Sequence, residues 1–156
     1  MEDYIRFLRE RVGNELLLLP SAAVIAVNER GEVLLHERRD GSGWGLPGGY
    51  LQPGEDAAGA AAREALEETG WRVEVTGLAG VFSDPARITV TYGNGDRVQG
   101  VVVVLSARAV ESVQDPDPGE TVRAAFFLPV ALPGSCRPLT RWMIERWLSG
   151  SGRPFY

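Results

Sequence analysis

The feature that most limits the possible folds of this chain is a glycine-rich loop that leads into an alanine-rich helix. Gly48 and Gly49 end the loop, and the helical pattern covers Asp56–Thr69. Asp56 is a residue type that caps helix N-termini, and Gly70 stands where a glycine commonly ends a helix. We therefore predict a loop–helix unit in the middle of the chain.

Three glutamates crowd the second half of this helix. At about 100° per residue, Glu64, Glu67 and Glu68 share an arc about 100° wide. We expect the other side to pack on a sheet through Ala58, Ala61, Ala62, Ala65, Leu66 and Thr69. Each like-charge pair costs roughly 0.2–0.5 kcal/mol in an isolated helix. The negative end of the helix dipole disfavours these anions further, so the cluster needs a cation to offset its charge.

Three carboxylates in a group form a hard oxygen donor set, which suits Mg²⁺, Mn²⁺ or Ca²⁺. A solvated acidic helix face is the alternative interpretation of such a run. The glycines at positions 48 and 49 favour a binding site, because glycine lets the backbone approach a metal or a phosphate closely.

The segments around this unit predict strands and two more helices. A short N-terminal helix falls within residues 1–13, and a C-terminal helix within residues 138–149. Residues 41–49 read as loop, and Asn94-Gly95 as a tight turn. The predicted strands cover residues 22–27, 32–37, 73–82, 88–92, 98–105 and 122–128, with 101–104 in the middle of a covered sheet. We expect an α/β fold with a mixed sheet flanked by helices.

Composition sets the class of protein. The chain has 156 residues and a net charge of −5, which suits one domain over residues 1–156 and disfavours binding to a nucleic acid polymer. The single cysteine, Cys136, has no disulfide partner and no zinc-site spacing. The apolar stretch Leu16–Val27 is about half the ~20 residues that span a bilayer, and the acidic N-terminus lacks the start of a signal peptide. We expect a cytoplasmic protein with no membrane partner.

The spacing resembles the signature of the Nudix (MutT-like) hydrolase family. Seven positions are in register: Gly49, Glu55, Arg63, Glu64, Glu67, Glu68 and Gly70. Ala65 and Trp71 stand at two positions that are aliphatic in the family, yet both are apolar. The resemblance covers the box at residues 49–71 and extends over most of the chain. It implies an α/β/α sandwich and a Mg²⁺-dependent pyrophosphohydrolase, with Mn²⁺ as a possible substitute, that cleaves a nucleoside diphosphate linked to a group X.

The resemblance also implies roles for individual residues. Glu64, Glu67, Glu68 and the Gly49 carbonyl hold metal, while Glu55 and Arg63 orient the ligand glutamates. Metal lowers the pKa of a water that attacks phosphorus. Glu67 is the first choice inside the box for the general base, and Glu64 belongs to the same catalytic set.

An additional acidic residue is predicted outside the box. Glu120 lies on the loop before the strand at residues 122–128, where such hydrolases often place a base or metal-linked glutamate. Asp115 and Asp117 compete for that role, and a solvated loop carboxylate is the alternative.

Further residues are candidates for contact with substrate. Arg38 and Arg39 precede the glycine loop and could bind phosphate or form surface ion pairs. Phe82 and Tyr92 could stack on a base or belong to the core. We interpret His36, the only histidine, as structural, and we assign Cys136 no catalytic role.

The resemblance leaves the substrate open within the class of small nucleotides. Pro85 lies fourteen residues after Trp71, near the position that is typical of ADP-ribose-type enzymes. A hydrolase of nucleoside triphosphates or damaged nucleotides and a dinucleoside polyphosphate hydrolase remain alternatives. A Nudix-fold nucleotide-binding module without catalysis is the alternative from another class. A homodimer is possible, as among similar proteins.

Overall fold

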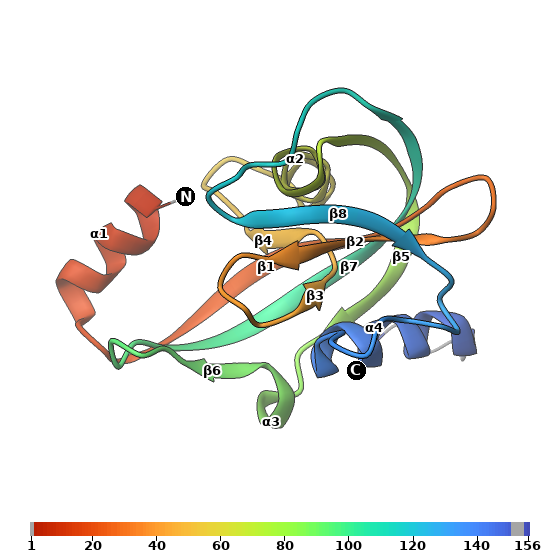
Figure 1. Ribbon diagram of the computed structural model, residues 1–156. Helices are drawn as coiled ribbons and strands as arrows, with labels where there is room; N and C mark the ends of the chain where they lie inside the picture. The colour runs from red at the N-terminus through yellow and green to blue at the C-terminus, as the bar shows by residue number, and fades with distance from the viewer. Residues whose placement is uncertain (1, 151–154) are drawn as a thin grey trace.

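The computed structural model describes residues 2–150 and 155–156 (Figure 1). The elements are α1 (Glu2–Val12), β1 (Leu16–Val27), β2 (Val33–Arg38), β3 (Trp44–Gly45), β4 (Gly48–Tyr50), α2 (Ala57–Thr69), β5 (Trp71–Phe82), α3 (Pro85–Ile88), β6 (Thr89–Thr91), β7 (Arg97–Ser112), β8 (Thr121–Phe127) and α4 (Pro138–Ser149). None of the described helices combines the length and apolar character needed to cross a membrane.

Within the described residues, eight strands form one mixed sheet. Its central path runs β3-β2-β1-β7-β5, while β4 pairs with β1, β8 with β2, and β6 with β7. β1 and β7 are parallel from Leu16↔Arg97 to Val27↔Arg108, and the other pairs are antiparallel. β7 thus lies between β1 and β5, which confirms the central place predicted for residues 101–104.

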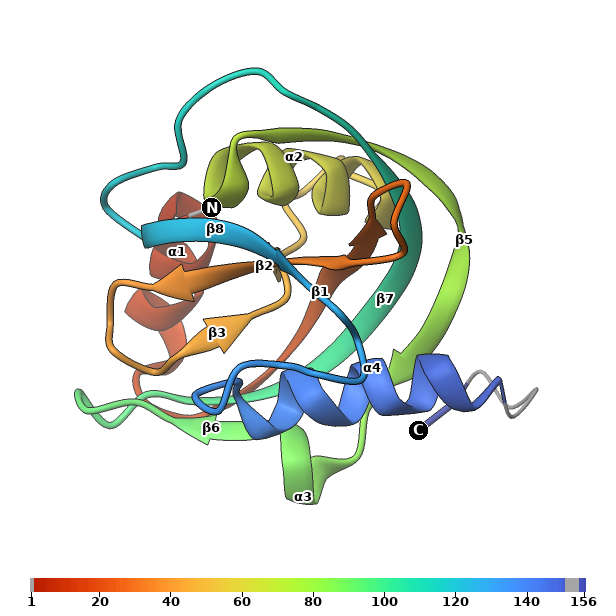
Figure 2. The same ribbon diagram turned by 45° about the vertical axis from the view of Figure 1, so that its right-hand side comes forward.

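Both faces of the sheet are covered, α2 lying on one side and α4 on the other (Figures 1 and 2). The alternation of side chains along β1 explains the two layers, because successive residues of a strand point to opposite faces. Ala22, Val24 and Ala26 join the cluster under α2. Ala23 and Ile25 join the cluster under α4. The predicted mixed sheet with helices on both faces is confirmed.

The structure departs from the prediction mainly in the glycine loop. Residues 41–49 contain β3 and the start of β4. These two short strands were not predicted, because their glycines and Pro47 are typical of loops. β4 pairs with the distant β1, where Gly49 aligns with Ala22, and β3 forms a hairpin with β2, where Gly45 aligns with His36. The short helix α3 was likewise not predicted. Met1, within the predicted N-terminal helix, lies outside the described residues.

Candidate functional site

Helix α2 forms the wall of the site, and both of its ends are capped as predicted. The Asp56 side chain accepts a hydrogen bond of 2.7 Å from the Gly59 N–H. Gly70 ends the helix with φ +75°, and its N–H donates to the Leu66 carbonyl over 2.9 Å. A Cβ at residue 70 would also collide with the Gln114 backbone. This position therefore requires glycine for its conformation as well as for space.

The three box glutamates do not share one environment. Glu64 and Glu68 are 5% and 2% exposed, whereas the side chain of Glu67 is 53% exposed. The expected separation of glutamates from packing alanines is therefore wrong, because Glu64 and Glu68 border Ala61 on the buried face and Ala58 is exposed. The strand β4 lies against the two carboxylates, with Gly48 at Glu68 and Gly49 at Glu64.

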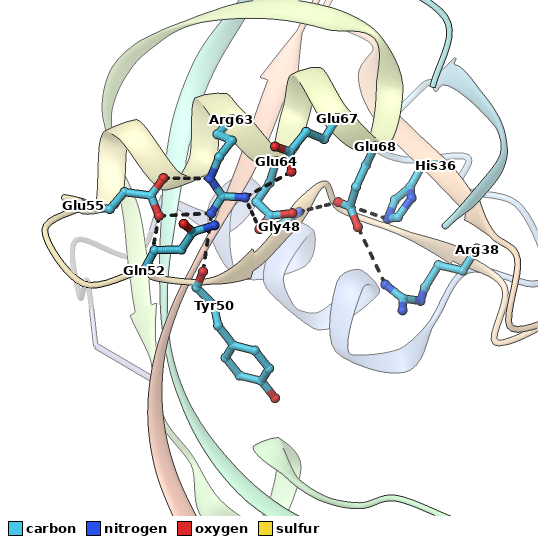
Figure 3. A network of polar contacts seen from close by, with 10 residues as sticks. All are labelled: His36, Arg38, Gly48, Tyr50, Gln52, Glu55, Arg63, Glu64, Glu67 and Glu68. Carbon is cyan, nitrogen blue, oxygen red and sulfur yellow. Dashed lines mark hydrogen bonds and ion pairs between the residues drawn. The ribbon is translucent and has the colours of Figure 1, made fainter. Parts of the chain in front are cut away.

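Glu68 is held between the glycine strand and β2 (Figure 3). Its Oε2 accepts a hydrogen bond of 2.8 Å from the Gly48 N–H and lies 3.5 Å from Nε2 of His36. Its Oε1 lies 3.9 Å from Nη1 of Arg38. Burial raises the pKa of Glu68 to about 8, because a desolvated carboxylate is less stable in its charged form.

Arg63 binds the other glutamates of the box (Figure 3). Its Nε and Nη2 donate to the two oxygens of Glu55 over 2.8 and 3.0 Å. Its Nη1 donates to Glu64 over 2.7 Å and to Glu67 over 3.1 Å. Glu55 in turn accepts from the Gln52 N–H. One guanidinium thus connects the loop to the helix and contacts two of the candidate metal ligands.

Gly49 provides the space for the Glu64 carboxylate. A Cβ at residue 49 would come within 2.7 Å of Cδ of Glu64, which is closer than real Cβ contacts. Burial raises the pKa of Glu64, although its pairing with Arg63 acts in the opposite direction. The charges of Glu67 and Glu120 also raise the pKa of Glu64. The charges of Glu64 and Glu120 raise the pKa of Glu68 in the same way.

The donor chemistry of this cluster fits a hard divalent cation. It offers carboxylate oxygens only, and a bound cation would stabilise the charged forms of Glu64 and Glu68, which burial disfavours. Among the described residues, however, no three His, Cys, Asp or Glu side chains are grouped closely enough to hold a metal as they stand. One oxygen of each buried carboxylate has a protein donor instead: Oε1 of Glu64 accepts from Arg63, and Oε2 of Glu68 accepts from the Gly48 N–H.

A cleft of about 1050 Å³ opens beside the acidic cluster. Its lining includes predicted site residues from separate parts of the chain, namely Arg38, Gly49, Glu64, Glu67, Glu68, Tyr92 and Glu120. Asp115 and Asp117, the competitors of Glu120, do not line it. The hydroxyl of Tyr92 lies 3.1 Å from the hydroxyl of Tyr50, a cleft residue that the sequence analysis did not single out.

Two predicted substrate contacts lie elsewhere. Phe82 is completely buried and packs on the rings of Trp142 and Tyr156, with centroids 5.0 and 4.9 Å away. It belongs to the core, so its assignment to substrate stacking was wrong. Arg39 is directed to the Thr121 carbonyl over 3.3 Å and does not line the cleft.

His36 is more closely connected to the site than expected. It is fully buried, and its Nδ1 lies 2.9 Å from Oγ1 of Thr121. Burial lowers the pKa of His36 to about 4, so its imidazole is neutral near pH 7. Its Nε2 lies 3.5 Å from Oε2 of Glu68, so the structural role predicted for His36 includes packing against Glu68. No spacing in the sequence indicated this contact.

The cleft contains another residue that sequence reasoning missed. Arg137, directly before α4, lines it together with Thr140 and Met143 of that helix. A lone arginine before a proline carries no recognisable motif, so only the folded structure places it here. Cys136, its neighbour, is buried in the core below α4, and its pKa is raised by burial.

Comparison with known proteins bears on what this cleft does. Residues 17–145 match the family described as "NUDIX domain", which includes both the acidic helix and the sheet. The chain belongs to this family. The Nudix box at residues 49–71 is thus the loop–helix unit that forms the acidic wall of the cleft.

Two curated relatives of this Nudix domain are informative. A Bacillus subtilis (strain 168) protein, provisionally named 8-oxo-dGTP diphosphatase, is 47% identical over 64 residues, covering 41% of this chain and 43% of the relative. A CMP-5'-(N-acetyl-N-hydroxy-3-aminopropyl)phosphonate hydrolase from Streptomyces rubellomurinus (strain ATCC 31215) is 33% identical over 127 residues, covering 74% of this chain and 61% of the relative. The matches therefore span less than two thirds of either relative.

The fold of the domain also has solved counterparts. A NUDIX hydrolase from Nitrosomonas europaea matches with a TM-score of 0.69 and 24% identity, covering 88% of this chain and 75% of its own. At this identity the likeness concerns the fold, which is that of Nudix hydrolases.

Proposed function

We propose that residues 1–156 act as one Nudix hydrolase domain that cleaves a nucleoside diphosphate linked to a group X. The observation that carries the proposal is the pair of buried carboxylates, Glu64 and Glu68, at the wall of a cleft that Glu67 and Glu120 also line. Buried like charges are unfavourable without a cation, and a divalent cation is what an anionic diphosphate needs in order to approach them.

Mg²⁺, or Mn²⁺ in its place, would be held by Glu64, Glu67 and Glu68 with the Gly49 carbonyl, and it would supply Lewis acidity for the hydrolysis. Arg63, held by Glu55, positions Glu64 and Glu67 through the contacts described above. Arg38, 3.9 Å from Glu68, contributes positive charge for phosphate oxygens.

The reaction is a hydrolysis that balances with water alone. The water oxygen forms a bond to one phosphorus, and the bond from that phosphorus to the bridging oxygen breaks. A carboxylate of the chain accepts the water proton, and the leaving phosphate takes the electron pair of the broken bond. We assign the proton to Glu67, whose side chain is half exposed in the cleft, and we keep Glu120 as the second candidate.

Small nucleotides are the proposed substrates. The two curated relatives are named for hydrolysis of a damaged nucleoside triphosphate and of a CMP-linked phosphonate, both of which are nucleotides linked to a further group. An ADP-ribose-like compound, which the position of Pro85 after the box favours, remains a candidate substrate. A cleft of about 1050 Å³ has room for a molecule of this size.

The deciding experiment is product analysis on a substrate panel. It includes ADP-ribose, the eight common NTPs and dNTPs, 8-oxo-dGTP, diadenosine polyphosphates and nucleotide sugars, each with Mg²⁺, Mn²⁺ or EDTA. Metal-dependent cleavage of one class supports the hydrolase and identifies X. Saturable nucleotide binding without cleavage of any compound would instead support the alternative of a catalytically inactive nucleotide-binding module.

A further inference from the structure

Arg137 is anchored at the edge of the cleft by its backbone. Its N–H donates to the Trp44 carbonyl of β3 and its carbonyl accepts from the Arg141 N–H of α4, both over 3.0 Å. The stem of its side chain passes beside Gly45, because a Cβ placed on that glycine would lie 3.8 Å from Cδ of Arg137. The position of the side chain is thus set by both β3 and α4.

Among the described residues, no carboxylate forms an ion pair with the guanidinium of Arg137. It makes no hydrogen bond or ion pair with any side chain or carbonyl in the described ranges 2–150 and 155–156. Arg9, Arg38 and Arg63 also line the cleft, and each has a carboxylate within 3.5 Å. Arg137 therefore differs from these three in lacking an acidic partner.

The unpaired charge of Arg137 is also partly desolvated. Its side chain is half-buried, and burial together with the charge of Arg38 lowers its pKa. Burying a cation without a partner is unfavourable, so an unpaired guanidinium in a cleft indicates a ligand that supplies the missing negative charge. The charges of Asp40, Tyr92 and Glu68 act on the pKa of Arg137 in the opposite direction, so the guanidinium lies within reach of Asp40 and of the acidic cluster without an ion pair to either.

We propose that Arg137 binds a further phosphate group of the substrate, beyond the diphosphate held at the acidic cluster. A guanidinium fits phosphate because its planar fork can donate two parallel hydrogen bonds to the oxygens. The proposal rests on the proposed function and narrows it. It favours substrates with three consecutive phosphates, such as nucleoside triphosphates, over a diphosphate linked to an uncharged sugar.

Calorimetric titration with inorganic polyphosphates tests the role of Arg137, because these ligands carry phosphates and no nucleobase. Pyrophosphate and tripolyphosphate are each titrated into the protein in Mg²⁺. We expect tripolyphosphate to bind the unaltered protein about tenfold more tightly, the increment of one charge-assisted contact. R137Q should lose that increment and keep its affinity for pyrophosphate within about twofold. R137K, which keeps the charge without the fork, should retain part of it.

Arg30 provides the matched control, because it is exposed in the turn after β1 and outside the cleft. R30Q removes the same charge and should preserve the increment. The proposal is overturned if the unaltered protein binds both polyphosphates equally, or if R137Q and R137K weaken both to the same degree. E68Q separates this proposal from the proposed function. If E68Q leaves Mg²⁺-dependent binding of both polyphosphates intact, the assignment of a metal site to the acidic cluster is wrong. The comparison of R137Q with R30Q still decides the role of Arg137.

Discussion

The Gly48 N–H donates a 2.8 Å hydrogen bond to the buried carboxylate of Glu68, and this contact joins the last turn of α2 to β4. Twenty residues separate the two in sequence. The contact aligns the glycine strand with the acidic face of the helix, so that backbone and carboxylates meet at one wall of the cleft. The amide oxygen of a glutamine at residue 68 could accept the same hydrogen bond from the Gly48 N–H.

Glu68→Gln should therefore abolish most turnover and leave the fold intact. The variant keeps the Gly48 hydrogen bond but loses a negatively charged ligand, and we expect kcat/KM to fall on the order of 100-fold or more. The free energy of unfolding should be unchanged or higher, because glutamine keeps the hydrogen bond and removes a carboxyl whose ionisation burial disfavours. Steady-state kinetics and thermal unfolding measure both, with exposed Glu29→Gln as the control. Activity equal to that of the unaltered protein would refute the metal assignment of Glu68.

Gly49→Ala should impair activity more than stability. The added methyl group meets the Glu64 carboxylate, the far end of a flexible side chain, which can shift more readily than backbone. Displacing a ligand of the reacting centre lowers kcat/KM on the order of 10- to 100-fold. Gly134→Ala is the control, since a Cβ there has no neighbour within 4 Å. Equal activity of the two variants would show that Gly49 does not position Glu64.

Gly70→Ala should do the opposite and chiefly destabilise the protein. Its backbone has φ +75°, and the new Cβ would collide with the Gln114 backbone, which cannot rotate away. We expect a loss of about 1–3 kcal/mol in the free energy of unfolding. Denaturant titration gives this value directly, and a loss below a few tenths of a kcal/mol would contradict the assigned cap.

Comparison of Glu67→Gln with Glu120→Gln identifies the general base. Loss of the base lowers kcat by about 100-fold or more, whereas loss of a nearby carboxylate has a smaller effect. We expect the larger loss for Glu67→Gln, with Asp115→Asn as a control outside the cleft. The reverse order, measured at saturating substrate and Mg²⁺, would transfer the role to Glu120.

Phe82→Ala should destabilise the fold without a specific effect on substrate affinity. The buried ring packs on Trp142 and Tyr156, and its removal leaves a cavity that costs about 3–5 kcal/mol. The milder Phe82→Leu keeps enough of the core for kinetics, and its KM should match that of the unaltered protein. A raised KM in a stable Phe82→Leu protein would return this residue to the binding site.

Much of this molecule was predictable because its signals are local. The N-cap Asp56, the C-terminal Gly70 and the helix between them depend on backbone chemistry within a few residues. The central place of β7 follows from apolar residues on both of its faces. The acidic box was recognisable for the same reason, since its residues recur at fixed spacing within 23 positions.

Only the tertiary structure decided which residues face the cleft. Phe82 and Tyr92 are both aromatic residues after the box, yet packing buries the first against α4 and leaves the second beside Tyr50. Arg137 enters the site because α4 crosses the sheet next to β3, a contact between segments about ninety residues apart. The amino-acid sequence by itself determined the family and its acidic helix, through local spacing. The partners of Glu68 on β4 and β2 and the place of Arg137 in the cleft depended on long-range packing, which no local pattern encodes.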